Sequence, residues 1–284
     1  MVNTICICGA GTMGSGIAQV SAQSGFYTIL FDVNENVLEK SKENIQKNLT
    51  FLVDKQKISA EDKDQIYERI KFVNDTNDCI ADVIIEAIIE KIDAKVALFN
   101  KLSEINHAEV VFATNTSSIS VSDIQKKVHH PERVVGMHFF NPAYLMKLVE
   151  VVKGEQTNSE VALTVYDLCR QMGKSPVMCK DAPGFIVNRI ARHYYLEAMK
   201  LVEQGAATFE NVDAIMEATG FKMGPFRLMD LIGMDINLSV SQSIYKAFDN
   251  EERFKPSNLQ IEKVKSGELG RKTGKGFYEY KSEP

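Results

Sequence analysis

The sequence predicts an α/β protein whose first part holds a mostly parallel sheet and whose second part is all helical. Three observations predict this architecture. Apolar runs of strand length alternate with helix-like segments through the first part. A glycine-rich motif directly follows the first of these runs. Beyond the turn residues Asp181–Gly184, the apolar spacing becomes helical. We therefore expect two domains, over residues 1–182 and 183–284.

The first strand and the turn after it indicate a nucleotide site. Thr4–Cys8 is almost continuously apolar, as in a parallel strand that is buried on both faces. It ends in Gly9-Ala10-Gly11-Thr12-Met13-Gly14, which opens a helix expected over 15–24. In a GxGxxG motif the first glycine makes a tight turn, the second lets a pyrophosphate approach the backbone, and the third lets helix and strand pack closely. These residues predict dinucleotide binding by a Rossmann-type domain.

The next strand, Tyr27–Phe31, favours NAD(H) as the dinucleotide. It ends in Asp32, about twenty residues beyond the start of the motif. A carboxylate in this position accepts a hydrogen bond from the ribose 2′-hydroxyl and repels a 2′-phosphate. We therefore expect NADP(H) to be the weaker cofactor.

The rest of the first domain continues the alternation. We expect helices over 35–54 and 93–105, and strands at Ile70–Val73, Val83–Ala87, Val110–Ala113 and Val134–Met137. Alternating elements imply right-handed crossovers, and the ligands of such sheets collect at the carboxyl ends of the strands. The polar run Thr114–Ser118 and the residue His138 follow two of the expected strands, so both should lie at that edge.

His138 is a candidate general base because histidine titrates near neutral pH. Glu150 lies twelve residues later, on the next expected strand, where a carboxylate would fix the ring tautomer and stabilise the charged ring. The alternative for His138 is an ordinary core or surface histidine. Ser117 also has two interpretations, a hydrogen-bonding group of the site or the N-cap of the next helix.

The second domain is expected to hold helices over 185–203, 209–219 and 234–248 and near 257–265. Apolar residues at helical spacing here, such as Ile190 and Met199, indicate a core or a subunit interface more than a ligand site. The tail Gly270–Tyr278 is basic and rich in glycine, which suits either a phosphate contact or a solvated loop.

Composition excludes several classes of protein. The 284 residues are 44% hydrophobic and 25% charged with a net charge of −5, and they contain no long basic run of the kind that binds nucleic acid. We see no signal peptide at the start and no apolar run long enough for a membrane span. Of the five cysteines, Cys79, Cys169 and Cys179 are scattered at no metal-ligand spacing. We expect a reduced, cytoplasmic protein that binds no metal, nucleic acid or membrane.

Taken in order, six motifs resemble the L-3-hydroxyacyl-CoA dehydrogenases over essentially the whole chain. They are Gly9-x-Gly11-x-x-Gly14, Asn115–Ser118, His138–Pro142, Lys147–Val151, Pro183–Arg189 and Gly224–Phe226. The chain length is most similar to that of the bacterial 3-hydroxybutyryl-CoA dehydrogenases. The resemblance implies an NAD-dependent oxidoreductase that interconverts a (3S)-3-hydroxyacyl-CoA and a 3-oxoacyl-CoA, with 3-hydroxybutanoyl-CoA and acetoacetyl-CoA as the expected short-chain pair. It also implies a homodimer that forms through the helical domain.

The resemblance further implies roles for single residues. His138 corresponds to the catalytic base and Glu150 to its partner. Ser117 and Asn188 correspond to hydrogen-bonding groups at the reacting oxygen. The resemblance also implies that five further residues lie near the cofactor: Glu90, Lys95, Asn115, Asn141 and Lys272.

The helix after Asp32 carries several lysines, and in the family this arm meets coenzyme A. Asn48 and Lys55 are therefore expected to contact the substrate, although family members hold serine at the position of Asn48. For each of the other lysines of the arm, a solvated face shared with acidic residues is the simpler interpretation.

Two alternatives remain, and the second belongs to a different functional class. One is an NAD-dependent dehydrogenase of a free hydroxy acid or sugar acid on the same fold, against which the lysine-bearing arm argues. The other is a non-catalytic dinucleotide-binding protein, against which the presence of both His138 and Glu150 argues. The sequence leaves open the acyl-chain length, the physiological direction and the exact oligomeric state.

Overall fold

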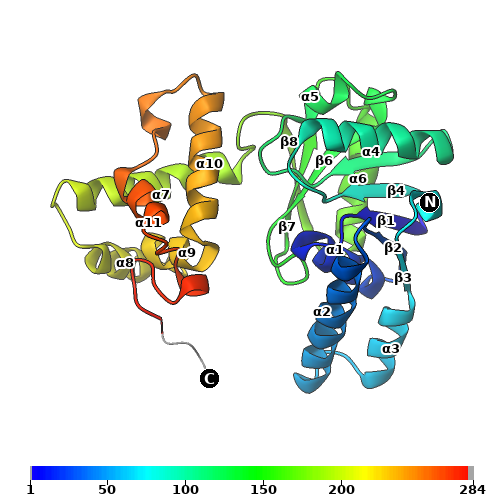
Figure 1. Cartoon of the computed structure of the whole chain (residues 1–284), viewed down its shortest axis with the longest axis horizontal. Coiled ribbons are helices and arrows are strands. Elements are labelled where there is room, and N and C mark those ends of the chain that lie inside the picture. The colour runs from blue at the N-terminus through cyan, green and yellow to red at the C-terminus, as the bar shows by residue number, and fades with distance from the viewer. Residues whose placement is uncertain (1, 281–284) are drawn as a thin grey trace. The chain divides into compact units, whose positions relative to one another are not determined.

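The computed structural model describes residues 2–280 (Figure 1). The chain folds as two compact units, the first ending at Ala182 and the second beginning at Pro183. Each unit is built around a hydrophobic core of its own. Among the described residues, no helix has the length and apolar character that a membrane span requires.

The described part of the first unit is centred on a sheet of eight strands (Figure 1). They are β1 (Thr4–Cys8), β2 (Tyr27–Phe31), β3 (Ile70–Val73), β4 (Val83–Glu86), β5 (Val111–Thr114), β6 (Val134–Phe139), β7 (Leu148–Lys153) and β8 (Ser175–Lys180). The strand order is β3-β2-β1-β4-β5-β6-β7-β8, and the first six strands pair in parallel. β7 runs antiparallel to β6, and β8 runs parallel to β7. The order 3-2-1-4-5-6 is that of a Rossmann fold, which binds its nucleotide beside the first strand, where the order reverses.

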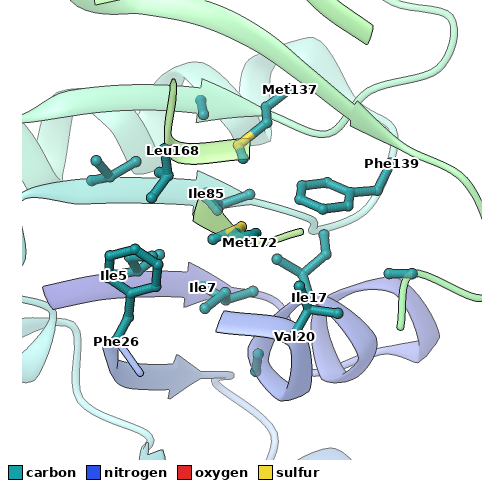
Figure 2. Packing of buried hydrophobic residues seen from close by; sticks show 14 of the residues in the cluster. Ile5, Ile7, Ile17, Val20, Phe26, Ile85, Met137, Phe139, Leu168 and Met172 are labelled. Atoms are coloured by element: carbon teal, nitrogen blue, oxygen red, sulfur yellow. The ribbon is translucent and has the colours of Figure 1, made fainter. Parts of the chain in front are cut away.

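Helices cover both faces of this sheet. One face packs against α1 (Thr12–Gln23), α2 (Glu35–Asp54), α3 (Ala60–Glu68) and α6 (Ser159–Gln171). Figure 2 shows Ile7 of β1 close to Ile17 and Val20 of α1, within one cluster that also includes Leu168 of α6. This cluster joins the sheet to the helix that starts at the glycine motif.

The opposite face packs against α4 (Ile92–Ile105) and α5 (Val121–Gln125). The ring centroids of Phe99 in α4 and Phe112 in β5 lie 5.1 Å apart on this side. Short 3₁₀ turns, η1 (Thr76–Asp78) and η2 (Pro131–Arg133), lie in the connections that lead to β4 and β6. The central strands are therefore buried on both faces, as their apolar runs predict.

The second unit is built from helices. They are α7 (Val187–Glu203), α8 (Phe209–Ala218), α9 (Pro225–Ile232), α10 (Met234–Ala247) and α11 (Asn258–Lys265), with the 3₁₀ turns η3 (Glu252–Phe254) and η4 (Arg271–Thr273). Phe226 and Met229 of α9 are fully buried in its core. Asp230 is also buried, and its carboxylate accepts hydrogen bonds from Phe277 N at 3.0 Å and Tyr278 N at 2.9 Å, which fastens the tail to α9.

The predicted α/β class with a helical second part is confirmed, and the structure adds α3, α6, β8 and α9 to the predicted elements. α3 is short and mostly charged, and its start is set by a capping box between Ser59 and Asp62 instead of by apolar periodicity. β8 is an edge strand with exposed or half-exposed residues and contains Pro176, so it lacks the alternation that marks a half-buried strand.

Two predicted boundaries near the glycine motif and His138 are also corrected. α1 begins at Thr12, three residues before the predicted start, because Gly11 already acts as its N-cap. β6 continues through Phe139, so His138 lies inside the strand and not after it. Pairing with β7 explains this extension, since His138 and Phe139 both have register partners on that strand.

Candidate active site

His138 and Glu150 face each other across β6 and β7. They are register partners in the antiparallel ladder, so their side chains project from the same face of the sheet. His138 Nδ1 lies 2.7 Å from Glu150 Oε2. Both residues are buried, with 5% and 1% of their surfaces exposed. The structure therefore brings the two residues together within hydrogen-bond distance.

The contact with Glu150 determines which nitrogen of the ring is basic. An ionised carboxylate only accepts hydrogen bonds, so the proton of a neutral ring lies on Nδ1 and the basic lone pair lies on Nε2. The ring of Phe140 packs beside the imidazole, with 4.5 Å between the centroids. The arrangement is that of a general acid–base group held by an orienting partner.

The loop after β5 adds polar groups at the same edge of the sheet. Asn115 Oδ1 accepts a hydrogen bond from Phe139 N at 2.9 Å, which ties the end of β5 to the end of β6. Ser117 follows in this loop and is half-buried. The N-cap of α5 is Ser120, whose Oγ accepts a hydrogen bond from Asp123 N at 3.1 Å. The interpretation of Ser117 as that N-cap is therefore wrong.

A buried charge network joins the ends of β4 and β5. Glu86, the last residue of β4, is fully buried, and its Oε1 lies 2.6 Å from Lys95 Nζ. Lys95 is itself 1% exposed and also lies 3.0 Å from Glu90 Oε2. Thr114 Oγ1 donates to Glu86 at 2.7 Å, and Thr116 Oγ1 donates to Glu90. The network therefore connects the loop after β4 with the loop after β5.

The two carboxylates of this network differ in their ionisation. Burial raises the pKa of Glu86, although Lys95 opposes the shift. Burial also disfavours ionisation of Glu90, but Lys95 and the Thr116 hydroxyl outweigh it and hold the pKa of Glu90 below its usual value. Glu90 is therefore the more strongly acidic of the two groups, and Lys95 is shared between them.

Glu86 is not among the residues predicted from the sequence. The signal that marks it is a carboxylate within the apolar run Val83–Ala87, because a carboxylate buried in a sheet needs a partner. The partner, Lys95, is predicted only through the family resemblance. Neither the spacing nor the composition of this segment distinguishes a buried ion pair from a solvated one.

Each glycine of the GxGxxG motif has its own steric role. Gly9 has a φ of +103°, and a Cβ there would lie 2.5 Å from the carbonyl oxygen of Ala87. A Cβ on Gly14 would lie 1.7 Å from the carbonyl oxygen of Gly9. At Gly11 a Cβ would meet nothing within 4 Å. The first and third glycines thus shape the turn, and the second keeps open space at the start of α1, where a pyrophosphate would bind.

A pocket of about 660 Å³ opens beside this turn. Its lining combines the turn, the end of β2, the loop after β4 and one side of α4: Gly9, Gly11, Asp32, Val33, Ala87, Ile88, Ile89, Ala94, Ala97, Leu98 and Lys101, among others. Asp32 accepts hydrogen bonds from Ala10 N at 2.8 Å and Asn34 N at 2.9 Å through different oxygens. Each carboxylate oxygen has a further lone pair for a ligand hydroxyl. A mainly apolar pocket with one carboxylate fits an adenosine group.

The predicted substrate contacts lie on α2. Asn48 is half-buried, and its Nδ2 donates to Oε1 of the buried Gln19 in α1 at 3.2 Å. Lys55 is the C-cap residue of α2 and is exposed, with its Nζ 5.5 Å from the ring centroid of Phe51. Asn48 therefore helps to pack α2 on α1, whereas Lys55 presents its charge at the end of the arm.

Three other predicted site residues are described within their own units. Asn141 follows β6, is exposed, and precedes Pro142 through a cis peptide bond. Asn188 and Lys272 belong to the second unit. Asn188 is half-buried in the first turn of α7, and Lys272 pairs with Asp235 at 2.5 Å.

Both units match one family of known proteins. Residues 4–182 match the 3-hydroxyacyl-CoA dehydrogenase NAD binding domain, and residues 184–280 match the 3-hydroxyacyl-CoA dehydrogenase C-terminal domain. The chain is 43% identical over 284 residues to the 3-hydroxyadipyl-CoA dehydrogenase of Escherichia coli (strain K12). That match covers 99% of this chain but 60% of the relative, so the chain spans about three fifths of its length.

Two shorter relatives match from end to end. The chain is 38% identical to a probable 3-hydroxybutyryl-CoA dehydrogenase of Bacillus subtilis (strain 168), with 98% of both chains covered. Among solved structures, the (S)-3-hydroxybutyryl-CoA dehydrogenase from Ralstonia eutropha has a TM-score of 0.94 at 37% identity, covering 99% of this chain and 100% of that one.

Proposed function

Because the chain belongs to the 3-hydroxyacyl-CoA dehydrogenase family, we propose that it interconverts a (3S)-3-hydroxyacyl-CoA and the matching 3-oxoacyl-CoA with NAD(H). The observation that carries this proposal is the buried His138–Glu150 pair, 2.7 Å apart, in the unit that also contains the glycine turn and its pocket. The matched relatives are named for CoA thioesters, which favours these over free hydroxy or sugar acids as substrates.

The reaction needs one proton transfer at the substrate oxygen. In the oxidative direction, Nε2 of His138 accepts the proton of the 3-hydroxyl, and Glu150 stabilises the imidazolium that results. NAD⁺, when bound, supplies the hydride acceptor. In the reductive direction the protonated His138 returns its proton to the 3-oxo oxygen. Ser117 and Asn188 donate hydrogen bonds to that oxygen, an effect worth about 3 kcal/mol for one well-placed donor.

The proposed cofactor site has two parts. The glycine turn receives the pyrophosphate, and the pocket at Asp32 receives the adenosine, with NAD(H) preferred to NADP(H) because the carboxylate repels a 2′-phosphate. Glu90 is proposed to contact the nicotinamide half, together with Asn115, Asn141 and Lys272. Since Lys95 is buried against two carboxylates, we propose that it acts by fixing Glu90.

The remaining proposals concern substrate, assembly and location. The arm formed by α2, with Lys55 and Asn48, contacts coenzyme A, and 3-hydroxybutanoyl-CoA and acetoacetyl-CoA are the expected short-chain pair. The chain forms a homodimer through the second unit. It works in the cytoplasm, with which five unpaired cysteines agree.

The decisive experiment compares His138→Gln with the parent in acetoacetyl-CoA reduction by NADH. Loss of a general acid–base group lowers turnover by about 10²- to 10⁴-fold, while NADH affinity, measured by fluorescence titration, should stay near the parental value. His129→Gln is the matched control, because His129 is exposed beyond α5 and should leave turnover unchanged. Parental turnover in His138→Gln would disprove the assignment.

A substrate and cofactor panel tests the finer proposals. Initial rates with CoA thioesters of increasing chain length, and with free 3-hydroxy acids, should be highest for the four-carbon thioester. Each rate is measured with NAD(H) and NADP(H), and equal efficiency with both would contradict the role given to Asp32. If the protein acted on free acids alone, the proposed thioester substrate would be wrong and a free hydroxy acid or sugar acid would take its place.

A further inference from the structure

Three cysteines from two distant segments meet in the core of the first unit. Cys6 and Cys8 alternate on β1, so their side chains point to the same face of the sheet. Cys79 comes from the crossover between β3 and β4, just after η1. The three Sγ atoms all lie within 4.8 Å of one another, and none of the three residues is exposed. Cys79 stands at no metal-ligand spacing in the sequence, and the fold nevertheless brings its sulfur beside those of Cys6 and Cys8.

The distances between these sulfurs match a three-coordinate metal ion. A metal–sulfur bond is about 2.3 Å long, so three sulfurs around one ion in a plane are about 4.0 Å apart. Cys6 Sγ and Cys8 Sγ are 3.9 Å apart, and no pair exceeds 4.8 Å. An ion fits at the centre after sulfur movements of about 1 Å or less.

The electrostatics of the cluster also favour a cation. The sulfurs of Cys6 and Cys8 lie 3.9 Å apart, and Cys79 Sγ lies 3.9 Å from the carbonyl oxygen of Asp75. Their charged neighbours, Asp78 and Asp75, are acidic and add negative potential at Cys79. A thiolate buried here is costly unless a cation neutralises it, because buried charges are normally paired or bound to metal.

We propose that Cys6, Cys8 and Cys79 form a binding site for one soft monovalent metal ion, with Cu(I) as the best match. Thiolate ligands favour soft ions. Among the described residues, the cluster offers three ligands and no fourth His, Cys, Asp or Glu, whereas structural zinc sites take four. Each thiol that becomes a thiolate ligand releases one proton to solvent, and no electron is transferred.

The position of Cys79 explains how an ion could enter the site and why its binding would stabilise the first unit. The crossover is a surface segment, with 48% of Ile80 exposed beside the buried Cys79. Asn106 at the end of α4 holds this segment, since its side chain donates to Cys79 O at 2.9 Å and accepts from Ala81 N at 3.0 Å. Local opening of the crossover admits an ion, and a bound ion then links the crossover to β1. Cu(I) should therefore stabilise the first unit.

The test titrates the full chain with Cu(I) under anaerobic conditions, in competition with bicinchoninate. We expect one tightly bound ion per chain, X-ray absorption from sulfur neighbours alone at about 2.3 Å, and a higher Tm. Cys79→Ser removes the ligand from the crossover. Loss of an outer partner of a metal ligand costs about 10- to 100-fold in affinity, so loss of a ligand should cost about 100-fold or more.

The controls separate specific binding from folding defects. Cys169→Ser and Cys179→Ser remove cysteines outside the cluster and should bind Cu(I) like the parent. Cys6→Val keeps an apolar, strand-favouring residue in β1, and it should lose tight Cu(I) binding while retaining NADH binding as a sign of correct folding. Equal Cu(I) affinity in the parent, Cys79→Ser and Cys6→Val would overturn the proposal. A parent that prefers Zn(II) to Cu(I) would overturn the assigned ion.

Discussion

Buried charges in the first unit serve two different purposes at the scale of single residues. His138 lies against the buried carboxylate of Glu150, which can hold the ring in either of its protonation states. Lys95 instead lies between the carboxylates of Glu86 and Glu90, so its charge is balanced and fixed. We propose that the first arrangement performs proton transfer and that the second holds the loops around it.

Glu86→Gln tests the second arrangement. The change leaves Lys95 buried with Glu90 and without the Glu86 charge, and breaking a buried ion pair costs about 3–5 kcal/mol. Because Glu90 still shares the lysine, we expect the free energy of unfolding to fall by about 3 kcal/mol. NADH affinity should also fall, since Ala87–Ile89 line the pocket directly after Glu86. Urea unfolding and NADH titration measure the two effects.

Glu109→Gln is the control for this substitution, because Glu109 is exposed before β5 and should change stability by less than about 0.5 kcal/mol. A Glu86→Gln variant as stable as the parent would show that the pair contributes nothing to the fold.

The sequence predicts some of these residues and not others for a physical reason. Gly9 to Gly14 act through backbone geometry at fixed spacing, so the motif itself carries their role. His138 and Glu150 lie within recognisable apolar runs. Glu86 acts through a partner on a helix, and its burial depends on how α4 covers the sheet, which no local pattern states.

At the scale of elements, the glycines of the turn between β1 and α1 have two different roles. Some are needed for the packing of the turn, and one is needed for ligand binding. In Gly14→Ala the new Cβ would lie 1.7 Å from the Gly9 carbonyl oxygen, so α1 must shift away from β1. We expect a loss of about 3 kcal/mol in the free energy of unfolding, at the upper end of overpacking effects. Thermal unfolding measures this loss.

Gly11→Ala is the matched variant, because its Cβ meets nothing within 4 Å. It should unfold within about 0.5 kcal/mol of the parent yet bind NADH more weakly, since the methyl group enters the space reserved for the pyrophosphate. If both variants lost stability equally, the division of roles would be wrong.

The segment directly after α11 makes a pH-dependent contact. Glu268 pairs with Lys263 and with Lys275, and these partners lower its pKa from 4.5 to about 2. A lowered folded-state pKa means that the contact stabilises the fold above pH 4.5 and loses this effect as the pH falls towards 2. Glu268→Gln should therefore reduce the urea midpoint at pH 7. The gap from the parent should narrow at pH 3.5, and a gap that stayed constant would contradict the ion pairs.

Element prediction succeeded where one local rule acts and failed where several compete. The apolar runs of β1, β2 and β4 are predicted because both faces of each strand are buried. β8 is not predicted, because it lies at the edge of the sheet beyond the antiparallel strand β7. The change from parallel to antiparallel pairing after β6 depends on which strands become neighbours in the sheet. The alternation of strands and helices along the chain does not specify this neighbourhood.

At the scale of the whole molecule, the proposed dimer can be tested through exposed apolar residues of the second unit. Ile236 of α10 is 51% exposed, and Ile215 of α8 is 60% exposed. Single exposed apolar residues are common on protein surfaces, so the choice of these two residues rests on the proposed dimer through the second unit and not on their exposure. Sedimentation should give twice the mass of one chain, and Ile236→Asp together with Ile215→Asp should reduce it to one.

The control for the dimer is Leu163→Asp, because Leu163 of α6 is 56% exposed in the first unit. This variant should sediment like the parent. A parent that sediments as a single chain would refute the proposed dimer without touching the proposed chemistry, because His138 and Glu150 both lie in one unit of one chain.

The pairing of β6 with β7 also affects how the protein tolerates changes in chain length. His138 and Glu150 are neighbours across a ladder, so the connection over 140–147 does not set their separation. Insertions or deletions in that connection leave the proposed acid–base pair intact as long as the two strands keep their register. A slip of one residue in the register, with every amino acid unchanged, would turn one of the two side chains to the opposite face of the sheet. Changes of length in the connection would therefore act on Asn141, the proposed cofactor contact, and on Phe140 beside the imidazole, whereas a register slip would act on the acid–base pair itself.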